Sequence, residues 1–199
     1  MKKIILSLIA VLFIISACSD SSSPSETKEI LPLKVGNEWN YSFNSEDSNY
    51  NYSFYIEKDT LINDSIWYKL KVDSLNSFLT KNKKCGLWFY DINCSDTSNS
   101  AYLKYAYPVI YDDVWYDVIK NYQMHVISRN MQVVVPAGVF SCYVYQKTYP
   151  KQYGNDFKMA IDEMYFSPGI GLIKVINFIY VDNKKEMESY QELTSYTLK

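Results

Sequence analysis

The chain has 199 residues and a formal net charge of −2, so it lacks the basic excess that binds nucleic acid. It contains 20 Tyr, 9 Phe and 4 Trp but one histidine. Aromatic side chains favour β-strands, and a single histidine leaves few routes to a zinc site or a catalytic triad. The composition therefore predicts a β-rich protein that binds no nucleic acid.

The first 17 residues have the three zones of a secretory signal. Lys2 and Lys3 supply positive charge, residues 4–15 form an apolar run, and Ser16-Ala17 ends it. The run is shorter than the roughly 20 residues that a helix needs to cross a bilayer. We therefore expect residues 1–17 to be a signal peptide that is removed from the mature protein.

The residues at the end of this signal carry a resemblance. Ile15-Ser16-Ala17-Cys18 resembles the lipobox of bacterial lipoproteins. The resemblance implies that Cys18 receives lipid and holds the protein to a membrane of the cell envelope. Each buried methylene contributes about 0.8 kcal/mol, so two or three chains anchor firmly. Ser19 is not the acidic residue associated with inner-membrane retention, which favours the outer membrane and leaves the leaflet open.

Residues 18–29 are expected to form a lipidated flexible tether. The segment is rich in serine and has no large apolar residue, so it cannot bury enough surface to fold. A flexible chain of this length reaches about 18 Å. The predicted organisation is a signal at 1–17, the tether at 18–29 and one β domain at 30–199.

Large apolar and polar residues alternate in several segments of the mature chain. The pattern is clear in residues 39–44, 50–57 and 66–73, and a period of two predicts strands with one solvated face. Tight turns are expected at Asn63-Asp64, Pro136-Ala137-Gly138, Ser167-Pro168-Gly169 and Asn183-Lys184. The sequence predicts an all-β fold: one antiparallel meander of about ten strands, curled into an open or half barrel. A closed barrel and a β-sandwich are the alternatives.

Three further phrases carry a second resemblance. Residues 31–41 (LPLKVGNEWNY), 135–143 (VPAGVFSCY) and 165–174 (YFSPGIGLIK) resemble segments of a group of uncharacterised bacterial envelope lipoproteins, and residues 59–64 are similar to one of their hairpins. The resemblance implies an antiparallel half-barrel or barrel domain. The group has no assigned activity, so no catalytic residue is carried over.

Polar residues that could support catalysis or bind metal are scattered. His125 lies in an expected strand without a serine elbow anywhere in the chain, which argues against a Ser-His hydrolase. Asp112, Asp113 and Asp117 form the densest acidic group but lack the ligand spacing and glycine of a calcium loop. We interpret His125 as structural and the aspartates as a solvated turn, and we expect no metal or cofactor.

Two other motifs also favour a structural interpretation. Asp162 and Glu163 are adjacent, so on a strand they point to opposite faces and cannot share a site. Gly169-Ile170-Gly171 lacks the third glycine of a nucleotide loop and precedes a β-like run, which favours a hairpin corner. The sequence therefore predicts no catalytic residue.

Three cysteines remain besides Cys18. Cys85 and Cys94 are candidates for a local disulfide, which would stabilise the fold by about 2–3 kcal/mol. Cys142 lies in an apolar strand and is expected to be a buried thiol. A Cys85–Cys142 bond is the alternative pairing.

The excess of aromatic residues is the strongest pointer to a function. Five of them lie out of phase with the aliphatic residues of their strands: Trp67, Trp88, Tyr90, Tyr143 and Tyr145. They form either an exposed platform for sugar rings or acyl chains, or packing on both faces of a large curved sheet. The leading hypothesis is a non-enzymatic envelope lipoprotein that binds or carries an apolar or carbohydrate ligand in the concavity of the sheet. A structural subunit of an envelope complex is the rival, and an enzyme with a hidden pocket is a third hypothesis.

Overall fold

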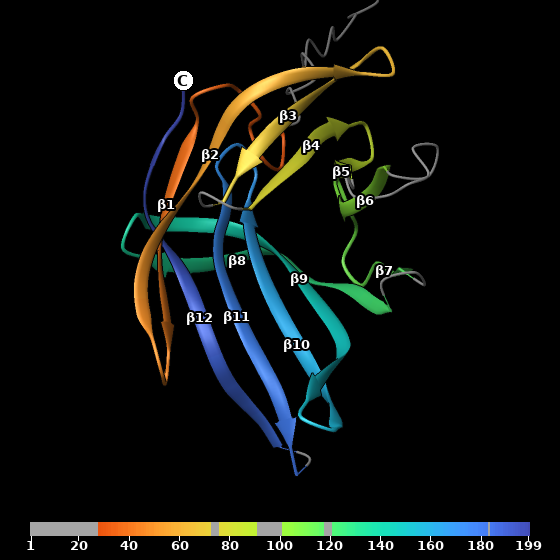
Figure 1. Cartoon of the computed structure of the whole chain (residues 1–199), viewed down its shortest axis with the longest axis vertical. Helices are drawn as coiled ribbons and strands as arrows, with labels where there is room; N and C mark the ends of the chain where they lie inside the picture. The colour runs from red at the N-terminus through yellow and green to blue at the C-terminus, as the bar shows by residue number, and fades with distance from the viewer. Residues whose placement is uncertain (1–27, 73–75, 91–100, 118–120, 183) are drawn as a thin grey trace, which may run out of the picture.

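The computed structural model describes residues 28–72, 76–90, 101–117, 121–182 and 184–199 (Figure 1). The predicted signal, Cys18, residues 19–27 and Cys94 lie outside this part of the chain. Among the residues described, none forms a helix of the length and apolarity that crossing a bilayer requires. The twelve strands are β1 Glu38–Ser45, β2 Asn49–Ile62, β3 Ser65–Lys71, β4 Ser77–Lys83, β5 Gly86–Tyr90, β6 Ala101–Ala106, β7 Val114–Asp117, β8 Tyr122–Val135, β9 Gly138–Tyr153, β10 Asp156–Ser167, β11 Gly171–Val181 and β12 Lys184–Thr197.

The strands form one antiparallel sheet in meander order. The spatial order is β6-β5-β4-β3-β2-β1-β12-β11-β10-β9-β8-β7, so β1 pairs with β12 and the two edges are β6 and β7. The prediction of an all-β open meander is confirmed, with twelve strands in place of about ten. The alternatives are wrong, because β6 and β7 share no hydrogen-bonded ladder and a single sheet cannot make a sandwich.

The two edges approach each other through side chains. Tyr145 on β9 is fully buried, and its hydroxyl donates a hydrogen bond of 2.7 Å to the carbonyl oxygen of Ala106, at the end of β6. Its ring centroid lies 5.5 Å from that of Tyr105 on β6 and 6.1 Å from that of Trp115 on β7. Aromatic packing thus joins the edges where backbone pairing is absent.

At the predicted turns the backbone has the positive φ angles that hairpins require. Asn63 and Asp64 have φ values of 48° and 57° between β2 and β3, and Gly169 has 84° between β10 and β11. Residues with short polar side chains, or none, adopt positive φ at the lowest cost. The last hairpin turns one residue earlier than expected: Asp182 has a φ of 49°, and Lys184 already belongs to β12.

The concave face of the sheet, here called the inner face, is apolar over one half of its length. Trp39 and Tyr41 of β1 are buried there, as the alternation in residues 39–44 predicts. The Trp39 indole donates a hydrogen bond of 2.6 Å to the Ile170 carbonyl oxygen, and the Tyr41 hydroxyl donates one of 2.9 Å to that of Leu172. Buried polar groups need such partners. A cavity of about 80 Å³ remains between the apolar side chains.

The segment before β1 closes this apolar half at one end. Ile30 and Leu31 belong to this segment, and both are buried. The Glu29 carbonyl oxygen accepts a hydrogen bond of 2.7 Å from the Gly169 amide, and the Leu31 carbonyl oxygen accepts one of 2.8 Å from the Asn82 side chain. We call this end, where the chain enters the domain, the anchor end.

The β8–β9 hairpin supplies a second layer on the opposite face. It crosses β11 and β12 at a steep angle in Figure 1, and the Ala137 amide donates a hydrogen bond of 3.1 Å to the Leu193 carbonyl oxygen. Val133, Val135 and Cys142 of the hairpin are buried. Register shifts in the β8–β9 ladder, which bend strands, precede the crossing.

Candidate functional site: a polar groove on the inner face

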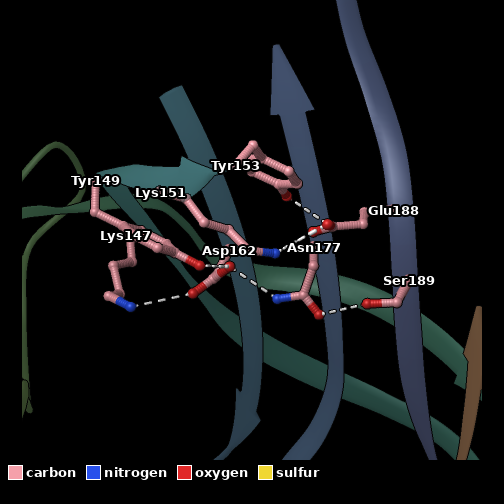
Figure 2. Close-up of polar contacts among 8 residues, drawn as sticks. All are labelled: Lys147, Tyr149, Lys151, Tyr153, Asp162, Asn177, Glu188 and Ser189. Atoms are coloured by element: carbon pink, nitrogen blue, oxygen red, sulfur yellow. Dashed lines mark hydrogen bonds and ion pairs between the residues drawn. The ribbon is translucent and has the colours of Figure 1, made fainter. Parts of the chain in front are cut away.

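The inner face becomes polar along the second half of β9. Lys147, Tyr149, Lys151 and Tyr153 occupy alternate positions, so they share one face of the strand. Lys147 pairs across the ladder with Asp162 of β10, and both lie on the inner face. These four residues repeat a Lys-x-Tyr unit twice, and each unit converges on one carboxylate (Figure 2).

Asp162 is the carboxylate of the first cluster. It accepts hydrogen bonds from the Lys147 ammonium at 3.2 Å, the Tyr149 hydroxyl at 3.1 Å and the Asn177 amide nitrogen at 2.8 Å. The Asn177 amide oxygen in turn accepts a bond of 3.0 Å from the Ser189 hydroxyl. The cluster therefore runs across four strands, β9 to β12, and fixes the orientation of each polar group.

Glu188 is the carboxylate of the second cluster. The Lys151 ammonium donates to both of its oxygens, at 2.9 and 2.7 Å, and the Tyr153 hydroxyl donates to one of them. Lys151 also lies 5.0 Å from the centroid of the Tyr153 ring. Figure 2 shows the two clusters side by side on the same face.

A register shift places Glu188 in this cluster. Asn177 pairs with Ser189 and Phe178 pairs with Met187, so Glu188 is the extra residue of a β-bulge. Regular alternation would turn Glu188 away from the face that carries the buried Ser189. Bulges redirect side chains at the margins of sheets, and here the bulge turns a carboxylate toward β9.

The charged groups of the second cluster stabilise one another. Burial favours the neutral form of Glu188, but the hydrogen bonds from Lys151 and Tyr153 outweigh it, so the pKa of this carboxyl is lowered. Burial also opposes the charge on Lys151, and the contacts with Glu188 and Tyr153 still raise the pKa of the ammonium. In the first cluster, burial raises the pKa of Tyr149, and the Asp162 charge raises it further. At neutral pH Glu188 and Lys151 are therefore charged and Tyr149 is neutral.

A groove of about 980 Å³ opens beside the second cluster, at the end of the sheet away from the anchor end. Its lining includes aromatic rings and the amide and hydroxyl groups of the clusters. The acidic residues in its lining are Glu46, Asp47, Glu186 and Glu188, and the basic residue is Lys151. This charge balance disfavours anionic ligands. The size suits a small polar ligand, whereas the 80 Å³ apolar cavity is too small for an acyl chain.

The histidine and the aspartates lie away from the groove. His125 contacts Asp112 at 2.6 Å, and the Asp112 side chain is 70% exposed. The Asp113 carboxylate accepts a hydrogen bond of 2.9 Å from the Ile110 amide, which is typical of a turn. Within the described ranges, no three His, Cys, Asp or Glu side chains gather as metal ligands would.

The interpretation of the adjacent carboxylates is confirmed. Asp162 joins the inner cluster, while Glu163 contacts Tyr165 at 2.9 Å and Lys185 at 2.6 Å on the other face. Residues 168–170 form the corner between β10 and β11, and Gly171 begins β11, as expected of a hairpin.

Cys85 and Cys142 form no disulfide within the described residues, so the alternative Cys85–Cys142 pairing is wrong. Cys85 is exposed and accepts a hydrogen bond of 3.4 Å from the Trp88 indole. Cys142 is buried, and burial raises the pKa of its thiol to about 12. Because Cys94 lies outside the described residues, the Cys85–Cys94 disulfide stays a prediction.

The five out-of-phase aromatic residues do not form one exposed platform. The sheet register places Trp67 and Tyr145 on opposite faces, and their exposed fractions are 4% and 0%. The packing interpretation is the correct one for these two residues. The lining of the groove contains two other aromatic residues, Phe43 and Tyr190.

The chain is similar in fold to solved structures. The chain is similar to a protein of Bacteroides fragilis whose name describes it as exported and of YmcC-like fold, with 11% identity and a TM-score of 0.56. It is also similar to a protein of Parabacteroides distasonis that is named as a lipoprotein, with 15% identity and a TM-score of 0.54. Each match covers 86% of this chain and 100% of the other. No protein-family model and no curated protein matches the chain.

Proposed function

We propose that this protein is a lipid-anchored, non-enzymatic protein of the bacterial envelope whose inner-face groove binds a neutral polar ligand of carbohydrate type. The observation that carries the proposal is the groove itself. It offers the aromatic side chains of Phe43 and Tyr190 and fixed hydrogen-bonding groups, and its lysine is already neutralised by a carboxylate.

The envelope location rests on the lipobox at Cys18 and gains support from the names of the two structural counterparts. Ser19 favours the outer membrane. Radiolabelled fatty acid fed to cells should label the wild-type protein, and Cys18→Ser should abolish the label and release the chain into the soluble fraction. A Cys18→Ser chain that stays with the membrane would contradict lipid anchorage.

The preference for a carbohydrate rests on the chemistry of the two clusters. Sugar rings present an apolar face that packs on aromatic rings and hydroxyl groups that bind amides and carboxylates. Phe43, Asn177 and Glu188 offer these groups in the lining of the groove. Lys151 holds the Glu188 carboxylate and helps to lower its pKa, which suits binding better than acid catalysis, since a general acid needs a raised pKa.

The ligand hypothesis is tested by glycan binding to the Cys18→Ser chain. A glycan array should give signals for neutral oligosaccharides and none for polyuronates. Phe43→Ala, which removes a ring from the lining of the groove, should weaken binding about tenfold or more, as loss of one stacking contact does. Tyr180→Ala, which removes a tyrosine 37% exposed on β11, is the matched control and should bind as the wild type does. Equal losses in both variants would contradict the groove.

A subunit of an envelope complex is the second candidate function. Tyr116 and Met159 border one recess on the outer surface, and Phe157 lies two residues before Met159 on the same face of β10. Their exposed fractions are 68%, 47% and 70%, and exposed apolar patches mark interaction surfaces. Crosslinking in intact cells that captures one stoichiometric partner at Phe157 would favour this function over ligand carriage.

A further inference from the structure

Lysine side chains gather at the anchor end of the domain. Lys28, Lys83 and Lys84 line one recess of about 310 Å³, and Glu29 is the acidic residue in its lining. All three lysines are exposed. The ion pairs found in the described ranges use none of the three. The recess therefore carries an excess of positive charge, whereas the groove at the other end is acidic.

The recess has a fixed frame. Lys83 and Lys84 lie at the β4–β5 turn, which the bond from Asn82 to the Leu31 carbonyl oxygen holds against the entering chain. The Tyr107 amide donates a hydrogen bond of 3.0 Å to the Cys85 carbonyl oxygen on the other side of the turn. The lysines therefore project from a braced turn and not from a free loop.

Aromatic rings accompany these lysines. The Lys83 ammonium lies 3.9 Å from the ring centroid of Trp88, and Tyr107 lines the recess. Trp and Tyr rings next to Lys side chains are the combination that proteins place at the boundary between membrane and water. The recess thus combines positive charge with aromatic rings of the kind found in the headgroup region of membranes.

The recess is close to Cys18 along the chain. Lys28 follows Cys18 by ten residues, and a random coil of that length spans about 18 Å. The β10–β11 turn, which contacts Glu29, and the β11–β12 turn beside the groove lie at opposite ends of the sheet (Figure 1). A lipidated Cys18 would bring the recess, and not the groove, next to the headgroups.

We propose that the recess formed by Lys28, Lys83 and Lys84 binds phosphate groups of anionic phospholipids in the membrane that holds the anchor. The contact orients the domain with its anchor end toward the bilayer and its groove away from the bilayer. It rests on the proposed lipid anchorage for its location, and on the recess alone for its chemistry. Basic pockets near a membrane surface recognise lipid phosphates in this way.

Vesicle binding tests the recess separately from the anchor. The Cys18→Ser mature chain should sediment with vesicles of equal parts phosphatidylglycerol and phosphatidylcholine, and not with phosphatidylcholine alone. The double variant Lys83→Gln/Lys84→Gln should weaken this binding about 30-fold, since each lysine near an anionic surface contributes about 1 kcal/mol. Raising the salt should weaken the wild type toward the level of the variant.

The matched control is Lys184→Gln/Lys185→Gln, which removes an equal charge from adjacent lysines at the groove end. It should bind vesicles as the wild type does. Equal losses in the two double variants would overturn the proposal, because net charge would then explain the binding. Binding of inorganic phosphate without binding of the mixed vesicles would also overturn it. Fatty-acid labelling of Cys18 decides the anchor separately.

Discussion

At the scale of single residues, a few buried tyrosine hydroxyls hold the apolar half of the sheet together. Tyr41 is 1% exposed, and its hydroxyl donates to the Leu172 carbonyl oxygen across the inside of the curl. Since β1 and β11 are not neighbours in the sheet, this bond ties strands that no ladder joins. Such a bond matters mainly because its loss leaves a buried carbonyl group unsatisfied.

Tyr41→Phe should therefore lower the free energy of unfolding by about 1–3 kcal/mol while keeping the ring in place. Tyr180→Phe removes a hydroxyl from a partly exposed ring and should change stability by less than about 0.5 kcal/mol. Urea denaturation of both variants measures the difference. Equal stabilities of the two variants would show that the Tyr41 bond contributes nothing.

Glu188 gives the site a dependence on pH that can be predicted in sign. Its pKa is lowered in the folded protein despite its burial, because Lys151 and Tyr153 bind the ionised form. The ionised carboxylate therefore stabilises the fold fully above its unfolded pKa of about 4.3. This contribution is lost as the pH falls through the lower pKa of the folded state.

Glu188→Gln should lower the free energy of unfolding by about 1 kcal/mol at pH 7, and the difference from wild type should shrink at acid pH. Denaturant titrations across this range measure it. Glu186→Gln changes an exposed carboxylate two residues away and serves as control, with little expected effect. A Glu188→Gln difference that stays constant with pH would contradict the ion pair.

At the scale of elements, bulges and tight corners decide which side chains meet. The β-bulge at Glu188 could not be predicted from the sequence, because the large apolar residues of 184–197 recur every three positions, a spacing that does not show where the register shifts. The Lys-x-Tyr repeat on β9 is visible in the sequence, but its partners Asp162 and Glu188 come from strands whose register only the folded sheet sets. The short strands β5 to β7 were equally hard to predict, since each spans six residues or fewer.

Gly86, at the start of β5, tests how closely β6 packs on that strand. A Cβ atom there would lie 2.1 Å from the Tyr105 carbonyl oxygen, and the φ of +135° disfavours other residues. Gly86→Ala should destabilise the protein by at least about 3 kcal/mol. Gly154→Ala, at a turn with a φ of +60° and open space, should cost about 1 kcal/mol. Thermal melts compare the two, and similar losses would show that the contact with Tyr105 relaxes freely.

At the scale of the whole molecule, the two ends of the curled sheet differ in character. The anchor end is closed by Ile30 and Leu31 and carries the lysine recess, while the other end opens into the acidic groove. Period-two alternation and turn residues were sufficient to predict the all-β meander and its open curl. The division between an apolar half and a polar half was not predictable, because it depends on how far the β8–β9 hairpin and the first strands extend along the sheet.

The most direct test of the central claim is to map ligand contacts on the Cys18→Ser chain by solution NMR. Backbone amide spectra would be recorded with and without a neutral oligosaccharide selected on the glycan array. We predict shifts confined to the groove, around Lys151 on β9, Asn177 on β11 and Glu188 on β12. Shifts centred on Phe157 and Tyr116 of the outer surface, or unchanged spectra with every neutral glycan, would contradict a ligand site on the inner face.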